Sequence, residues 1–178
     1  LKTVVKNKTV LLVAPGKSII KYKKDIEDQI ALDNVISIGL NLTEPFAVDF
    51  MMITRQDMYE AALNSGTSII TTSNVSKGTR GNVKVLNYKN WIDISEGRTH
   101  DSSSVILLNL LKACGVKSII LAGFDGFMVN INENYSDPNL RHPVSAEQVE
   151  RRNAYYKHFV QDLRGFGINV HFLTPSKY

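Results

Sequence analysis

Residues 102–127 read SSSVILLNLLKACGVKSIILAGFDGF and contain a predicted helix, a predicted strand and the turn after each. The apolar residues in the first half have helical spacing, which predicts a helix over Ser102–Cys114 that stops at Gly115. The segment Ser118–Gly123 is a nearly continuous apolar run, as is typical of a parallel strand buried on both faces. A helix that leads directly into such a strand indicates an α/β fold.

Similar apolar, β-branched runs recur at regular intervals, and helix-favouring segments separate several of them. The predicted strands are Thr9–Ala14, Val35–Leu40, Val48–Ile53, Ser68–Thr71, Val83–Asn87, Ser118–Gly123 and Ile168–Leu173. The other predicted helices are Ile19–Ala31, Arg55–Asn64 and Ala146–Arg164, the last with Ser145 as its N-cap. We therefore expect a doubly wound, mainly parallel, Rossmann-like three-layer sandwich of about six or seven strands.

Length and composition fit one globular domain over residues 1–178. Hydrophobic residues make up 43% of the 178 residues and charged residues 21%, which argues against a disordered chain. No apolar run is long enough to span a membrane. Cys114 is the single cysteine, so internal disulfides and cysteine-based metal sites are excluded. We expect a cytoplasmic domain and, because the sequence begins with Leu1, a piece of a longer protein.

The net charge of +4 is concentrated at one end of the chain. Seven lysines and no acidic residue lie in the first 24 residues, whereas the remainder holds more acidic than basic residues. Few aromatic residues are interleaved with these lysines. We interpret them as a solvated face or a seam with another domain, and nucleic-acid binding is disfavoured.

The turn after the first strand is the first candidate site. A strand, a tight turn and a helix in succession present free backbone N–H groups to a phosphate. Gly16 would allow close approach, Lys17 would add charge and Ser18 would cap the helix. A Walker A loop needs glycine where Leu11 stands, and G-x-G-x-x-G is absent, so an ordinary turn remains the alternative.

The second candidate site is the hydroxyl cluster Ser102, Ser103 and Ser104 at the start of a helix. One hydroxyl is enough to cap a helix. Three of them favour an anion-binding site, with simple capping as the alternative.

The third candidate site follows the strand Ser118–Gly123. Asp125 and Gly126 lie at the carboxyl end of that strand, where doubly wound folds bind ligands. Asp125 would orient a sugar or ribose hydroxyl or ligate a metal, or else form an Asx turn. The segment that follows is either a mobile lid or an ordinary polar loop. It contains His142, a candidate general base.

Three blocks together carry a resemblance to known families: LLVAPGKSI at 11–19, VISIGLN at 35–41, and residues 102–127. Their arrangement resembles the bacterial lipooligosaccharide sialyltransferases, which are Rossmann-like enzymes that use CMP-sialic acid without a metal. It also resembles the C-terminal domain of bacterial aldolase-type proteins. Those proteins carry an N-terminal TIM barrel of the hydroxymethylglutaryl-CoA lyase and 4-hydroxy-2-oxovalerate aldolase kind.

The sialyltransferase resemblance implies roles for individual residues. The ligand-contacting positions that match are Gly16, Ser18, Asn41, Ser103 and Asp125. His142 corresponds to the catalytic histidine and Tyr135 to an active-site tyrosine. Three positions depart from the family: Pro15 replaces a nucleotide-contacting asparagine, the asparagine after the third strand would fall near Thr54, and Ser104 replaces a glycine.

Two functions follow as hypotheses, and whether the domain is an enzyme stays open between them. The first is a nucleotide- or nucleotide-sugar-binding domain that resembles a glycosyltransferase, metal-independent if catalytic, with no firmly assigned cofactor other than such a nucleotide or CMP-sugar. Lys17 or Arg55 would then offset the charge of the phosphate. The second is a non-catalytic accessory domain that docks on a covalently linked TIM barrel. Aldolase chemistry itself needs a barrel of about 250 residues, which exceeds this chain.

Overall fold

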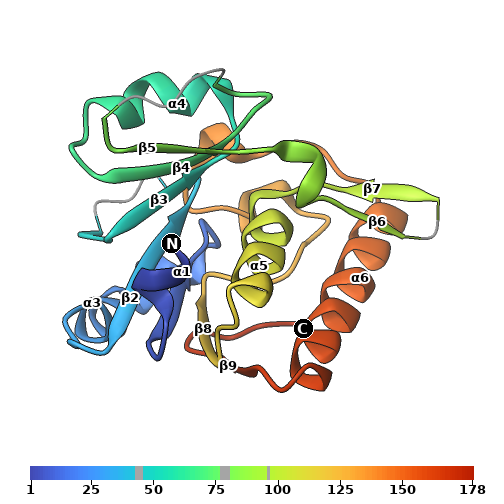
Figure 1. The fold of residues 1–178 in the computed structure, drawn as a ribbon. Coiled ribbons are helices and arrows are strands. Elements are labelled where there is room, and N and C mark those ends of the chain that lie inside the picture. The colour runs from blue at the N-terminus through green and yellow to red at the C-terminus, as the bar shows by residue number, and fades with distance from the viewer. Residues whose placement is uncertain (43–45, 77–80, 96) are drawn as a thin grey trace.

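A seven-stranded, all-parallel sheet forms the centre of the molecule (Figure 1). The structure is a computed structural model, and it describes residues 1–42, 46–76, 81–95 and 97–178. The strands are β1 (Thr9–Val13), β2 (Val35–Leu40), β3 (Phe50–Ile53), β4 (Ser68–Thr72), β5 (Val83–Leu86), β8 (Ser118–Ala122) and β9 (Asn169–Phe172). Their order across the sheet is β5-β4-β3-β2-β1-β8-β9. The predicted parallel α/β fold is confirmed.

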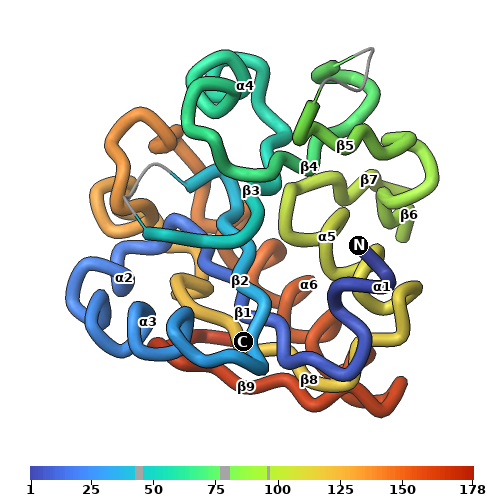
Figure 2. Tube along the Cα trace, turned by 60° about the vertical axis from the view of Figure 1, so that its left-hand side comes forward, coloured from blue at the N-terminus to red at the C-terminus, as the bar shows by residue number. Residues whose placement is uncertain are grey.

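Helices cover both faces of this sheet, as the two views in Figures 1 and 2 show. They are α1 (Lys2–Val5), α2 (Ser18–Lys21), α3 (Lys23–Ile30), α4 (Gln56–Leu63), α5 (Ser103–Ala113) and α6 (Ala146–Gly165). Short 3₁₀ turns are η1 (Tyr88–Asn90), η2 (Ile131–Glu133) and η3 (Pro138–Leu140). Side chains of α1, α5 and α6 share one core cluster, whereas those of α2, α3 and α4 belong to clusters on the opposite face. The molecule is a three-layer sandwich.

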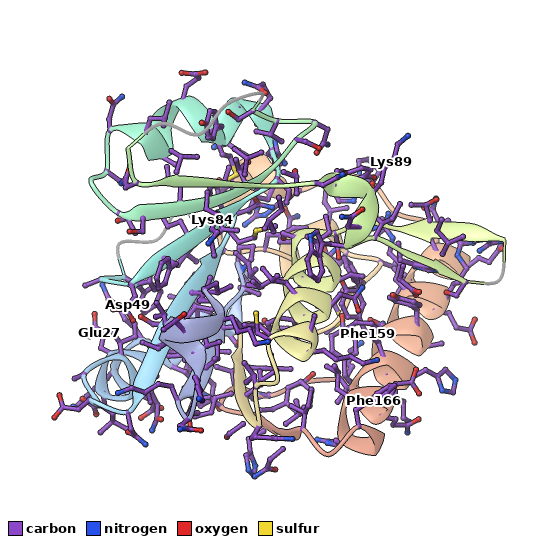
Figure 3. The ribbon with its side chains drawn as sticks, in the orientation of Figure 1. Glu27, Asp49, Lys84, Lys89, Phe159 and Phe166 are labelled. Atoms are coloured by element: carbon purple, nitrogen blue, oxygen red, sulfur yellow. The ribbon has the colours of Figure 1, made fainter. Side chains whose placement is uncertain are left out.

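Strand β1 shows why the apolar runs are continuous rather than alternating. Val10 and Leu12 pack with α5 and α6, whereas Leu11 and Val13 pack with α2 and α3. All four are fully buried, because helices cover both faces of the strand. On α6, the partly buried Phe159 packs against the same cluster as Leu12 (Figure 3).

The start of the long C-terminal helix agrees with the sequence in detail. The Ser145 side chain accepts a hydrogen bond from the backbone of Gln148, and the Gln148 side chain accepts one from the backbone of Ser145. This reciprocal pair is a capping box, which satisfies two backbone N–H groups at the start of the helix. The predicted N-cap is therefore confirmed.

Two segments differ from the sequence-based expectation. The predicted helix Ile19–Ala31 is split into α2 and α3, because Tyr22 has non-helical dihedral angles of φ −101° and ψ 22°. The stretch Lys89–Asp101, in which the sequence predicts no helix or strand, contains an antiparallel hairpin of β6 (Asp93–Ser95) and β7 (Arg98–His100), while Glu96 lies outside the described residues. Strands of three residues are too short to give a periodic signal.

The two neighbours of β1 place the ligand crevice. From β1 the chain continues to β2 on one side, and later segments add β8 on the other side. The strand order therefore reverses its direction between β1 and β8. This place, at the carboxyl ends of the two strands, is the topological switch point where doubly wound folds bind ligands. Among the described residues, no helix is both long and apolar enough to cross a membrane.

Candidate functional site

A cavity of about 280 Å³ lies at this switch point. Its walls come from the ends of β1, β2, β3 and β8, the first turn of α5, the segment after β8, helix α6 and the C-terminal residue Tyr178. Ten of the residues predicted from the sequence line it: Gly16, Asn41, Arg55, Ser102, Ser103, Ser104, Asp125, Gly126, Tyr135 and His142. The three candidate sites are therefore parts of one cavity.

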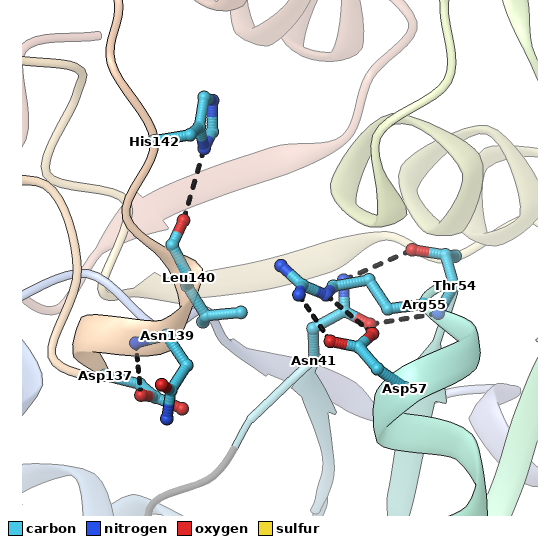
Figure 4. A network of polar contacts seen from close by, with 8 residues as sticks. All are labelled: Asn41, Thr54, Arg55, Asp57, Asp137, Asn139, Leu140 and His142. Atoms are coloured by element: carbon cyan, nitrogen blue, oxygen red, sulfur yellow. Dashed lines mark hydrogen bonds and ion pairs between the residues drawn. The ribbon is translucent and has the colours of Figure 1, made fainter.

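Asn41 joins three elements at the wall of the cavity. Its side-chain Oδ1 accepts a hydrogen bond from the backbone N–H of Thr54 at 2.9 Å, and its Nδ2 lies 3.2 Å from Thr54 Oγ1 (Figure 4). The same Nδ2 lies 3.2 Å from Ser103 Oγ on α5. Asn41 has a φ of 43°, a left-handed conformation that asparagine tolerates better than most residues. This position thus fixes the ends of β2 and β3 against the start of α5.

A cluster of three hydroxyl groups lies beside this network. Tyr156 Oη lies 2.5 Å from Ser102 Oγ and 2.6 Å from Ser104 Oγ, and the two serine oxygens are 3.1 Å apart. Ser102 is also the N-cap of α5, where its Oγ accepts a hydrogen bond from the backbone N–H of Val105. Capping thus uses one serine, Ser103 contacts Asn41, and Ser104 contacts Tyr156.

The turn after β1 has a structural role that the sequence did not reveal. The Gly16 N–H donates to the Gly123 carbonyl over 3.1 Å, and a Cβ at Gly16 would lie 2.2 Å from that oxygen. Ser18 donates to the carboxylate of Asp125 from both its backbone N–H and its hydroxyl, at 2.7 and 2.5 Å. Glycine is therefore needed at position 16 because two backbone segments touch, and Asp125 holds the turns after β1 and β8 together.

These contacts bear on the predicted phosphate cradle at Gly16, Lys17 and Ser18, which stays a prediction. The amides of Gly16 and Ser18 are already engaged, and α2 is a helix of only four residues. Lys17 is exposed and lies outside the cavity lining, with its Nζ 3.1 Å from the Asn132 carbonyl oxygen. The amides of Gly16 and Ser18 therefore connect the turn after β1 to the turn after β8.

Arg55 brings a positive charge to the cavity wall. Its Nε and Nη2 donate to both carboxylate oxygens of Asp57, at 3.0 and 2.5 Å, and these hydrogen bonds raise the pKa of Arg55. Figure 4 shows the guanidinium group facing Leu140 and His142 across the opening. A guanidinium group carries five N–H donors, so donors remain for a ligand while the ion pair is intact.

Both ring nitrogens of His142, the predicted general base, have partners. Nδ1 lies 3.2 Å from the Leu140 carbonyl oxygen, and Nε2 lies 3.2 Å from Nη1 of Arg152. A guanidinium group only donates hydrogen bonds, so Nε2 accepts and Nδ1 carries the proton. The lone pair that would take a proton from a substrate is directed at Arg152.

The segment after β8 is held by several contacts to the rest of the molecule. The Asn153 side chain bonds both backbone groups of Phe127, at 2.8 and 2.9 Å, and the Asn134 side chain does the same for Met128. Ser136 N–H donates to the Pro15 carbonyl over 2.9 Å. Of the two interpretations made from the sequence, these contacts favour an ordered polar loop over a lid.

Sequence reasoning missed two tyrosines of the cavity. Tyr156 has the helical spacing of a core residue, and it is indeed buried, but its hydroxyl reaches the cavity wall. Tyr178 belongs to no motif, and no local signal could have identified it. In the parts of the chain that the structure describes, no group of three or more His, Cys, Asp or Glu side chains could hold a metal ion.

Comparison with known proteins identifies no relative. No protein-family model, curated protein or solved structure matches this chain. The resemblance to sialyltransferases and to aldolase-associated domains therefore stays a prediction from the sequence.

Proposed function

We propose that the cavity binds a nucleotide or a nucleotide sugar. The observation that carries this proposal is that polar side chains and aromatic rings line one cavity at the switch point. The polar side chains are those of Asn41, Arg55 and the serines at the start of α5. The aromatic rings are those of Phe127, Tyr135, Tyr156 and Tyr178, and Tyr156 Oη contacts two of these serines.

The polar side chains of the lining have the chemistry of a phosphate or sugar site. Arg55 supplies a cation with unused donors, and the first turn of α5 directs backbone N–H groups and the positive end of a helix dipole toward the same region. Ser103, Ser104 and Asn41 offer hydroxyl and amide groups suited to hydroxyls of a ribose or sugar. A ligand with charged, polar and aromatic parts could therefore contact a complementary side chain with each part.

The proposal concerns binding rather than group transfer. The partners of His142 leave no free lone pair on its ring in this arrangement. A transfer reaction resembling that of a glycosyltransferase would first require Arg152 to release Nε2. Binding needs no such rearrangement, because the cavity and its donors are already formed.

Calorimetry and thermal shift with CMP, UMP and their sugar conjugates test this proposal. We expect saturable binding, which Arg55→Ala weakens by about tenfold or more, because a hydrogen bond to a charged group contributes about 1.5–3 kcal/mol. Lys17→Ala is the matched control, since it removes an exposed positive charge outside the cavity. If none of these ligands binds at millimolar concentration, the proposal is refuted. If Arg55→Ala and Lys17→Ala lose affinity equally, the phosphate does not bind at Arg55.

A further inference from the structure

Arg152 of α6 lies directly behind the wall of the cavity. Its Nη1 is 3.2 Å from Nε2 of His142, and its Cζ is 5.2 Å from the centroid of the Phe127 ring. Both His142 and Phe127 line the cavity, whereas Arg152 itself does not. Tyr156, which does, is four residues further along α6 and therefore on the same face of the helix. A rotation of the Arg152 side chain, without movement of the backbone, would thus bring its guanidinium group to the cavity.

The positive charge of Arg152 has no carboxylate to neutralise it. Among the described residues, none of its nitrogens lies within 4.0 Å of an acidic oxygen. Its partners are an imidazole nitrogen that accepts a hydrogen bond and the face of an aromatic ring. Arg55, by contrast, is paired with Asp57. A guanidinium group carries five N–H donors, so Arg152 offers an unpaired charge and most of its donors to an anion.

The field of this charge reaches the cavity. Burial raises the pKa of three tyrosines of the lining, and the charge of Arg152 opposes this shift in each: Tyr135, Tyr156 and Tyr178. The charge of Arg55 acts on Tyr135 in the same sense. In Figure 4 the guanidinium group of Arg55 faces His142 across the opening. An anion between Arg55 and His142 would therefore lie within reach of both guanidinium groups.

We propose that Arg152 is a latch operated by an anion: an anionic group bound beside Arg55 takes up the guanidinium of Arg152, which thereby releases Nε2 of His142. The inference rests on the proposed function for its ligand, whose phosphate is the anionic group. A guanidinium group can form two parallel, charge-assisted hydrogen bonds to a phosphate, each about twice as strong as a bond between neutral groups. The latched Arg152 has one hydrogen bond to an uncharged acceptor, so the bound phosphate favours the released arrangement.

The latch makes the state of His142 depend on the charge of the ligand. In the free protein Nδ1 carries the proton and lies 3.2 Å from the Leu140 carbonyl oxygen, so release of Arg152 changes the partner of Nε2 alone. The lone pair on Nε2 then becomes available to a hydroxyl group in the cavity. A neutral ligand lacks the group that operates the latch, so in its presence the lone pair stays bonded to Arg152.

Nitrogen NMR of the histidine rings in the full chain tests this inference, at a mildly alkaline pH where an imidazole ring is ordinarily neutral. His142→Gln identifies the Nε2 signal of His142 among those of the four histidines. Saturating UMP, or inorganic pyrophosphate as a probe without a base, should move this signal toward that of an unbonded nitrogen. Uridine, which has no phosphate, should leave the signal in place.

Arg152→Met removes the latch, and Arg151→Met is its matched control on the same helix. Arg151 lies outside the cavity lining, 3.7 Å from Glu147. In Arg152→Met the Nε2 signal of His142 should be in the released position without any ligand. Calorimetry should show that this variant binds UMP about three- to tenfold more weakly, because the bonds of Arg152 to the phosphate are lost. Arg151→Met should match the wild type in both measurements.

The outcomes separate the latch from the proposed function. If saturating UMP leaves the His142 signal in place, or if Arg152→Met and Arg151→Met bind UMP equally, the latch is overturned while nucleotide binding stands. If pyrophosphate moves the signal but no nucleotide binds, the proposed function is overturned and the latch is supported. Failure of every ligand to bind overturns both. Thermal unfolding shows whether Arg152→Met is folded, and an unfolded variant leaves the shift in the wild type to decide.

Discussion

Replacement of Gly16 by alanine should separate the turns after β1 and β8. The new Cβ would lie 2.2 Å from the Gly123 carbonyl oxygen and 2.8 Å from Cγ of Asp125. The nearer obstacle is backbone, so no side-chain rotation relieves the overlap. The two turns must move apart by about 1 Å, which breaks the 3.1 Å hydrogen bond between the Gly16 N–H and the Gly123 carbonyl.

The loss of stability follows from the steric overlap and from the broken hydrogen bond. Overpacking costs about 1–3 kcal/mol and the lost hydrogen bond about 1 kcal/mol, so the free energy of unfolding should fall by about 2–4 kcal/mol. For a chain of this length that corresponds to a fall in Tm of about 4–16 °C. Urea unfolding followed by circular dichroism and thermal unfolding measure the two quantities independently.

Gly165→Ala is the matched control for this substitution. Gly165 is the last residue of α6, and a Cβ there would meet no atom within 4 Å. Alanine favours a helix over glycine by up to about 1 kcal/mol, so this variant should be equally or more stable. A Gly16→Ala protein within about 0.5 kcal/mol of the wild type would refute the close contact between the two turns, since surface substitutions have effects of that size.

Three further predictions concern other parts of the molecule. Ser145→Ala removes the capping box of α6, and the free energy of unfolding should fall by about 1 kcal/mol in urea unfolding; no change would mean that the cap is not formed. Asn41→Ala removes three hydrogen bonds and leaves alanine at a positive φ, so the same measurement should show a loss of about 2–4 kcal/mol, and a loss under about 1 kcal/mol would contradict the network. The hydrogen bond to Asp101 raises the pKa of Tyr88 to about 12. The stabilisation by this hydrogen bond should be present below about pH 10 and lost as pH rises toward 12. The free energy of unfolding, measured in urea across this range, should therefore decline, and Tyr88→Phe should reduce the decline. An identical decline in that variant would contradict a stabilising contact between Tyr88 and Asp101.

Local patterns in the sequence determine the fold class and much of the site. Continuous apolar runs such as Ser118–Gly123 arise because a parallel strand is covered on both faces, and caps such as Ser145 act on backbone groups three residues away. The predicted helix over Ile19–Ala31 and the missed hairpin at Asp93–His100 show the limit of such patterns. A break at one residue, or a strand of three, leaves no periodic trace.

Site residues at strand ends were predictable for a related reason. Asn41, Ser103 and Asp125 follow, or lie beside, the carboxyl ends of parallel strands, and the parallel arrangement itself brings those ends to one edge of the sheet. Polar residues at such positions therefore share one edge of the sheet, and the strand order decides which of them meet. The sequence alone thus indicated the edge of the sheet that holds the crevice and ten of the residues that line it.

What only the tertiary structure decided is which of these groups are free and which are already engaged. Ser18 and Asp125 are 107 positions apart, yet their contact holds the turns after β1 and β8 together. His142 meets Arg152, and Tyr178 reaches the cavity from the far end of the chain. Such contacts depend on how distant segments pack. Hydrogen bonds and stacking act over a few ångströms in space, so the spacing of residues along the chain does not predict them.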